Sequence, residues 1–225
     1  MLTTWKPELK RFHDWLIRDT SDYLSMVLHG SVAAGDPWIE GHSDCDIILV
    51  YEKDQISHFA GAQAYLKGSK FDDHFHFFPI KKNDFLAPGS GTFAFSNAFR
   101  TKVLFGKDIL KKKEYPKRAA AGQLFGQEIE KQKASLQIYL VNSHKSVRKM
   151  RKEFWKLFKH TFMLLAIKIY AETGTYPKTR GEVIKLLHNP IVLRETWETL
   201  HFINDKSKEE ILRAGQNLLC YLQAL

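Results

Sequence analysis

Two aspartates and a glycine-serine pair are the residues of this chain whose types and spacing suit chemistry. Gly30 and Ser31 end one short apolar run, and Asp44 and Asp46 begin the next. Successive residues of a strand point to opposite faces, so we expect Asp44 and Asp46 on one face with Cα atoms roughly 6.6 Å apart. Carboxylates at that separation can share one or two hard cations as oxygen ligands. The spacing therefore predicts a metal site with Asp44 and Asp46 as ligands.

The glycine-serine pair indicates a phosphate site beside that metal. Gly30 falls where the backbone must turn sharply, and only glycine lets a phosphate approach the main chain closely. The hydroxyl of Ser31 can donate to a phosphate oxygen, while Mg²⁺ on the two aspartates would neutralise charge on the same triphosphate. Taken singly, these features also suit an ordinary turn and two solvated acids. Two acids on one face of a buried strand repel unless a cation lies between them, which favours the metal-nucleotide site.

The order of these residues resembles a known family signature. A hydrophobic-Gly-Ser step followed by Asp-hydrophobic-Asp-hydrophobic is the pattern of the DNA polymerase β-like nucleotidyltransferase superfamily, and residues 99–108 are similar to a later strand of its minimal and antibiotic-modifying members. The resemblance covers roughly the first half of the chain. It implies a small mixed sheet with flanking helices, Gly30 and Ser31 on the triphosphate, and Asp44 and Asp46 holding Mg²⁺ for in-line attack on the α-phosphate.

Members of that superfamily usually carry a third carboxylate on the next strand, which residues 71–80 predict here. Alternation puts Asp73 on one face and Asp72 on the other, so either could supply the acid. We favour Asp73 as the third catalytic residue. His74 and His76 share the face of Asp72 and offer either a base or ligand, or a structural contact.

The remaining pattern divides the chain into two domains. In the first half we expect helices over 7–20, 55–67 and 95–100 and strands over 25–28, 47–51, 71–80 and 103–105. A basic stretch containing a proline, residues 111–117, marks the boundary. Helical spacing then dominates over 119–141, 146–173, 179–188, 192–203 and 206–224. The fold class is therefore α+β, with a nucleotidyltransferase domain at 1–115 and an all-α helical bundle at 116–225.

The second half resembles the helical bundles found after, or encoded beside, minimal nucleotidyltransferases. That resemblance implies one face turned to the acceptor and another available to a second copy of the chain, as in a homodimer. Arg194 and His201 have the spacing of a ribonuclease motif found in some related helical proteins. Placement on a helix surface explains both residues and is the favoured interpretation.

Composition bounds the alternatives. The chain has 225 residues, 44% of them hydrophobic, and its two cysteines are too few for a disulfide framework or a zinc site. No apolar run approaches the ~20 residues that span a bilayer, so we expect a cytoplasmic protein without a membrane partner. The net charge of +9 suits a triphosphate and also nucleic acid. Nucleic acid is the less favoured partner, because the basic cluster at 145–152 has the pattern of a solvated helix face.

These observations predict a Mg²⁺-dependent nucleotidyltransferase that moves a nucleoside monophosphate, with AMP from ATP favoured, to a hydroxyl of a small molecule or protein, releasing pyrophosphate. Aminoglycosides are polycations, and the basic helical half disfavours them as acceptors. Three alternatives stay open. They are a non-catalytic nucleotide-binding or interaction module, a nucleotidyltransferase of the toxin-antitoxin type, and, less favoured, a transferase acting on RNA.

Overall fold

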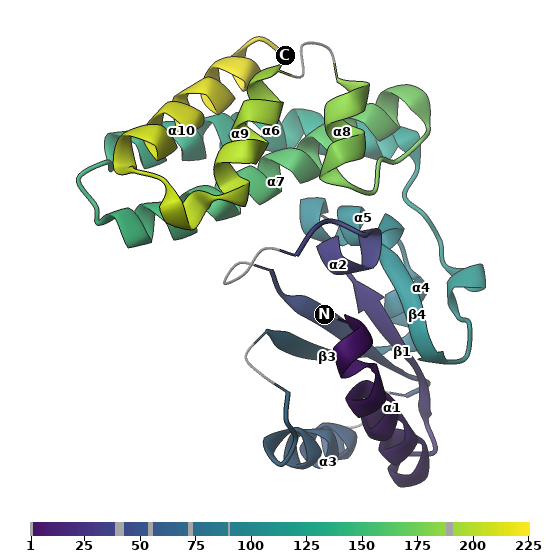
Figure 1. The fold of residues 1–225 in the computed structure, drawn as a ribbon. Coiled ribbons are helices and arrows are strands. Elements are labelled where there is room, and N and C mark those ends of the chain that lie inside the picture. Colours follow the sequence, from purple (N-terminus) through teal and green to yellow (C-terminus); the bar gives the residue numbers. More distant parts are fainter. Residues whose placement is uncertain (1, 39–42, 54–55, 72–73, 90, 188–190) are drawn as a thin grey trace. The chain divides into compact units, whose positions relative to one another are not determined.

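The computed structural model of the chain describes residues 2–38, 43–53, 56–71, 74–89, 91–187 and 191–225 (Figure 1). Its Cα trace separates into two compact units, one of residues 1–89 with 97–115 and one of residues 90–96 with 116–225. The division runs through helix α5 (Gly91–Phe99), whose first residues belong with the second unit.

The first unit is built on a four-stranded mixed sheet in the order β3-β2-β1-β4. Strand β1 (Tyr23–His29) pairs antiparallel with β2 (Cys45–Tyr51) on one side and with β4 (Thr101–Gly106) on the other. Strand β3 (Phe75–Lys81) lies parallel to β2 and forms the outer strand. Each predicted strand is present, although β3 begins at Phe75 instead of residue 71.

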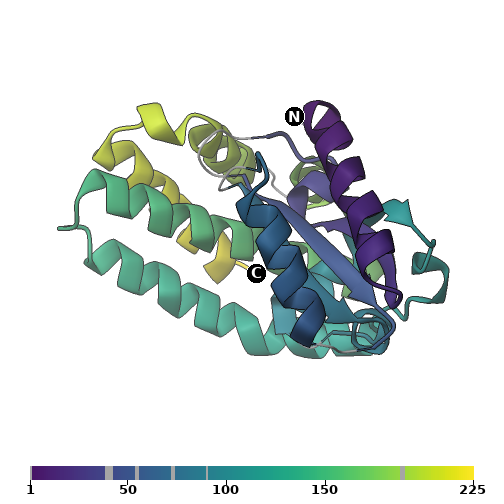
Figure 2. The same cartoon turned by 90° about the horizontal axis from the view of Figure 1, so that it is seen from below.

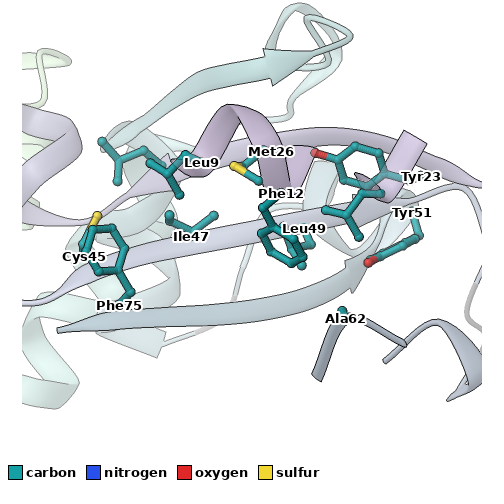
Figure 3. Close-up of a cluster of buried hydrophobic side chains, with 12 residues drawn as sticks. Leu9, Phe12, Tyr23, Met26, Cys45, Ile47, Leu49, Tyr51, Ala62 and Phe75 are labelled. Carbon is teal, nitrogen blue, oxygen red and sulfur yellow. The ribbon is translucent and has the colours of Figure 1, made fainter. Parts of the chain in front are cut away.

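Two helices cover one face of this sheet. Helices α1 (Leu2–Asp19) and α3 (Ile56–Lys67) lie side by side on it (Figure 2). Leu9 and Phe12 of α1 pack there with Ile47 and Leu49 of β2 in a fully buried cluster (Figure 3). Burial of apolar surface at roughly 25 cal/mol per Å² makes this cluster the main stabilising contact of the unit.

Helix α1 starts five residues earlier than the pattern predicts. The helix was expected to begin at residue 7, but Pro7 lies inside α1. The indole of Trp5 packs against the rings of Phe71 and Phe75 at centroid distances of 5.8 and 5.1 Å. These contacts stabilise the turn that precedes the proline.

Short elements cover the opposite face of the sheet. Helix α4 (Lys82–Leu86) and the 3₁₀ helix η1 (Leu110–Lys112) follow β3 and β4. A second core cluster forms under them from four buried side chains, which are Val27, Val50, Phe85 and Ile109. Helix α2 (Ser31–Ala34) follows β1, and its Val32 and Ala33 pack against the first cluster. Helices α2 and α4 were not predicted, since one helical turn is too short to show a periodicity.

The second unit is helical. Its elements are α6 (Arg118–Val141), α7 (Val147–Thr173), α8 (Arg180–Leu186), α9 (Ile191–His201), η2 (Ile203–Asp205) and α10 (Lys208–Gln223). Leu136, Phe154, Phe158 and Leu218 are buried between α6, α7 and α10. The predicted α+β fold class, a small mixed sheet with flanking helices followed by a helical region, is confirmed.

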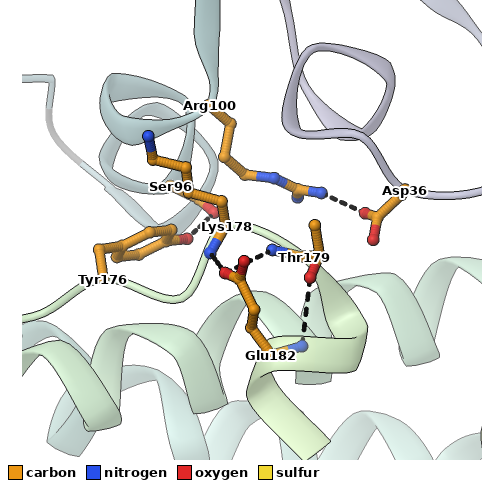
Figure 4. A network of polar contacts seen from close by, with 7 residues as sticks. All are labelled: Asp36, Ser96, Arg100, Tyr176, Lys178, Thr179 and Glu182. Atoms are coloured by element: carbon orange, nitrogen blue, oxygen red, sulfur yellow. Dashed lines mark hydrogen bonds and ion pairs between the residues drawn. The ribbon is translucent and has the colours of Figure 1, made fainter.

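Side-chain caps fix two helix starts in this unit. The hydroxyl of Thr179 accepts from the backbone N–H of Glu182, and the Glu182 carboxylate accepts from the backbone N–H of Thr179 (Figure 4). Ser207 and Glu210 form the same capping box on α10. In the same unit, the hydroxyls of Ser96 and Tyr176 are hydrogen-bonded to each other. Among the described helices, none has the length and apolar character that crossing a membrane requires.

Candidate active site

Described site residues lie at one end of the sheet. Gly30 follows the last residue of β1, Asp44 precedes the first residue of β2, and Arg100, which was not predicted, precedes the first residue of β4. Because β1 is antiparallel to both neighbours, these three positions meet at the same edge. The register pairs His29 with Asp46 on one side and with Thr101 on the other.

The side chains of strand β2 alternate between the two faces of the sheet. Cys45 and Ile47 are buried in the cluster under α1 and α3. Asp44 and Asp46 alternate with them and are only partly buried. The two carboxylates therefore lie on the face away from that core, as the alternation predicts.

Gly30 lies directly against Asp46. Its φ of 81° is in the region that favours glycine, and a Cβ added there would lie 3.4 Å from Oδ2 of Asp46. Ser31 opens the single turn of α2, which Gly35 closes with a φ of 90°. The structure thus brings the glycine-serine turn and the second aspartate together.

A buried ion pair holds this turn in place. The Arg100 guanidinium donates to Oδ2 of Asp36 (Figure 4), and these side chains are only 11% and 1% exposed. The backbone N–H of Gly30 donates to the carbonyl of Arg100 at 2.9 Å. Arg100 therefore binds both ends of the turn: its carbonyl accepts from Gly30, and its guanidinium donates to Asp36. Sequence reasoning missed this pair, because nothing local links two residues so far apart in the chain.

On the other side of Asp46 lies His76 of β3. The parallel register pairs the two residues, and Nδ1 of His76 is 3.4 Å from Oδ1 of Asp46. The predicted third acid, Asp73, and its alternative Asp72 lie outside the described residues, so that prediction remains a prediction. Strand alternation predicted which face of its own strand His76 shares with Asp72. It could not predict the register with β2 that places His76 beside Asp46.

The described donor set suits Mg²⁺. Magnesium is commonly held by one or two carboxylates and completes its shell with waters and substrate phosphates. Asp44 and Asp46 supply two partly buried carboxylates at this end of the sheet, and Asp46 lies beside Gly30. Among the residues that the structure describes, no group of three or more His, Cys, Asp or Glu side chains is arranged to hold a metal ion.

Arg194 and His201 both lie on α9. Arg194 is exposed, and the side chain of His201 is outside the described part of the chain. The ribonuclease interpretation of this pair remains a hypothesis.

Comparisons with known proteins bear on the fold. No protein-family model matches the chain, and a search of curated proteins found no match. Among solved structures, spectinomycin adenyltransferase AAD(9) from Enterococcus faecialis, crystallised with ATP and spectinomycin, is similar at a TM-score of 0.50 and 11% identity. The likeness covers 96% of this chain and 97% of that chain. The chain has a nucleotidyltransferase fold. At this identity the likeness shows the fold alone.

Proposed function

We propose that the chain is a nucleotidyltransferase that transfers a nucleoside monophosphate, with ATP as the favoured donor, to a hydroxyl of a small molecule or a protein. The observation that carries the proposal is the contact between Gly30 and Asp46 at one end of a sheet with this fold. A backbone that phosphate can approach and a carboxylate that can hold a cation are both needed for a triphosphate, and they lie side by side here.

The transfer is an in-line displacement. The acceptor oxygen forms a bond to the α-phosphorus, the bond from that phosphorus to the oxygen bridging the β-phosphorus breaks, and pyrophosphate leaves. The acceptor proton passes to water. Gly30 and Ser31 hold the departing phosphates, and Asp44 and Asp46 hold Mg²⁺, which when bound neutralises phosphate charge. Asp73 is proposed as the third catalytic acid.

The choice of donor and acceptor rests on the structural neighbour. AAD(9) is an adenyltransferase, crystallised with ATP and with spectinomycin, a small-molecule acceptor, which supports ATP and a small hydroxyl compound here. We propose residues 1–115 as the nucleotidyltransferase domain and 116–225 as a helical bundle domain of a cytoplasmic enzyme. Self-association through the bundle is the proposed oligomeric arrangement, and nucleic acid stays the less favoured acceptor.

The test is Mg²⁺-dependent pyrophosphate release from each of the four ribonucleoside triphosphates, with an acceptor panel of aminoglycosides, RNA and cell lysate. We expect release with ATP, and we expect Asp44→Asn combined with Asp46→Asn to abolish it while the circular dichroism spectrum stays unchanged. The matched control is Asp84→Asn combined with Asp108→Asn, two exposed acids of the same unit, which should keep full activity. Turnover that survives the Asp44 and Asp46 double replacement would contradict the metal assignment.

The same assay separates the enzyme from a binding module. If the wild-type protein binds ATP but releases no pyrophosphate with any acceptor, the non-catalytic nucleotide-binding function is the better explanation. One observation favours that alternative: the residue of β3 in register with Asp46 is His76, which is not an acid.

A further inference from the structure

Three rings lie around Asp46 on the face of the sheet that carries the candidate site. Parallel pairing sets His76 beside Asp46 and Phe78 beside Ile48, and antiparallel pairing sets His29 on the other side of Asp46. The ring centroid of Phe78 is 6.0 Å from that of His29 and 6.3 Å from that of His76. Both contacts are edge-to-face, so the phenyl ring reaches across β2 toward β1.

Phe78 is unusual among the phenylalanines of this sheet because it is 46% exposed. Phe75 of the same strand and Phe85 just after it are buried in the two core clusters. A large apolar side chain contributes most to stability when it is buried, so the exposed ring of Phe78 is free to contribute apolar contact to a ligand at the candidate site. The imidazole of His76 is also half-exposed next to it.

Strand order assigns this surface to one substrate. The glycine-serine turn follows β1, the two aspartates stand on β2, and β3 is the outer strand. In an in-line displacement the attacking oxygen approaches opposite the leaving group. If pyrophosphate leaves over Gly30 and Ser31, the acceptor must approach from the side of β3, where His76 and Phe78 lie.

We infer that His76 and Phe78 form the acceptor subsite, and that the acceptor is an uncharged aromatic hydroxyl of the kind that a tyrosine side chain carries. This inference rests on the proposed function and names the acceptor class for the same site. A phenol packed on Phe78 gains the ring contact and directs its hydroxyl toward His76 and Asp46, where an imidazole nitrogen can hydrogen-bond it.

Charge supports the aromatic hydroxyl over a polycationic acceptor. Both cross-strand neighbours of Asp46 are imidazoles. Neither imidazole is an anionic partner for a polycation, and Asp44 and Asp46 are committed to the metal in the proposed reaction. A neutral ring needs no such partner, because apolar contact and one hydrogen bond suffice to hold it.

The experiment measures binding of defined probes to the full chain with Mg²⁺ and the non-cleavable analogue α,β-methylene-ATP. The probes are N-acetyltyrosinamide, N-acetylphenylalaninamide, which lacks the hydroxyl, and spectinomycin, each titrated by ligand-observed NMR. We expect the tyrosine probe to bind best and Phe78→Ala to weaken it by about fivefold. His76→Phe should remove the preference for the tyrosine probe over the phenylalanine probe. The nucleotide analogue should bind Phe78→Ala within about twofold of the wild type.

Two variants keep the result interpretable. Phe78→Leu keeps an apolar side chain and loses the ring, so it should behave like Phe78→Ala. Phe202→Ala removes an exposed phenylalanine of the helical unit and should change no affinity.

Several outcomes would overturn the inference. They are tyrosine-probe binding that is unchanged in Phe78→Ala, no binding of that probe to the wild type, or tighter binding of spectinomycin. Weaker binding of the nucleotide analogue to Phe78→Ala would mean that Phe78 contacts the nucleotide and not the acceptor, which would also overturn the inference. The proposed function fails separately, if the wild type with Mg²⁺ does not bind the analogue at all.

Discussion

Replacing Arg100 by methionine measures what its ion pair with Asp36 contributes to the turn that carries Gly30. The two side chains are 11% and 1% exposed, so the loss of the guanidinium leaves a carboxylate with little access to water. Breaking such a buried pair costs about 3–5 kcal/mol. The matched control is Lys82→Met, which breaks the pair with Glu52. Those side chains are 28% and 47% exposed, and pairs of that kind contribute about 0–1 kcal/mol.

Native-state hydrogen exchange of the most protected amides in β1 and β4 reports this cost for the sheet unit alone. At 1.4 kcal/mol per tenfold, Arg100→Met should accelerate exchange by roughly two to three and a half powers of ten, and Lys82→Met by less than about tenfold. If the two variants accelerate exchange equally, burial does not strengthen the Arg100–Asp36 ion pair, and this pair does not hold the turn in place.

Three further predictions test other parts of the chain. Gly30→Ala and Gly35→Ala each place an alanine at a positive φ, which costs about 1–3 kcal/mol of stability, but only Gly30 faces Asp46. Calorimetric titration with α,β-methylene-ATP and Mg²⁺ should therefore show weaker binding for Gly30→Ala alone. Burial lowers the pKa of His160, opposed by nearby Glu128, so the unfolded chain binds more protons just below pH 6.5 and the free energy of unfolding should fall as the pH drops through that range. His160→Gln should flatten this slope in urea unfolding of the helical unit, and an unchanged slope would assign it elsewhere. Thr179→Ala removes one half of the capping box and should lower the stability of the helical unit by about 1 kcal/mol, measured in the same way, whereas no change would mean that the cap is redundant.

Strand alternation was accessible from the sequence because it is a geometric property of any strand. Once Ile47 and its apolar neighbours were assigned to a buried strand, Cys45 had to point inward and Asp44 and Asp46 outward. The structure has this arrangement, with Cys45 buried against Phe75 across the sheet. The fold class followed similarly, since alternating and helical periodicities occupy different halves of the chain.

Pairings between distant segments were not accessible. The rings of Phe71 and Phe75 pack with Trp5, a contact between segments far apart in the sequence. The parallel register that brings His76 to Asp46 is likewise a pairing of two separate segments. The extension of α1 before Pro7 has the same origin, because tertiary contacts of Trp5 override the local preference of proline.

The parity of β2 couples the stability of the unit to its proposed chemistry. Cys45 and Ile47 anchor the strand under α1 and α3, and the same anchoring presents Asp44 and Asp46 on the opposite face. A slip of one residue in the pairing would exchange the two sets, burying carboxylates and exposing apolar side chains. Cys45→Leu should therefore shift β2 and displace Asp44 and Asp46, although residue 45 itself does not contact the substrate. Because overpacking a core typically costs about 1–3 kcal/mol, its effect should appear in β2 exchange rates as well as in nucleotide affinity.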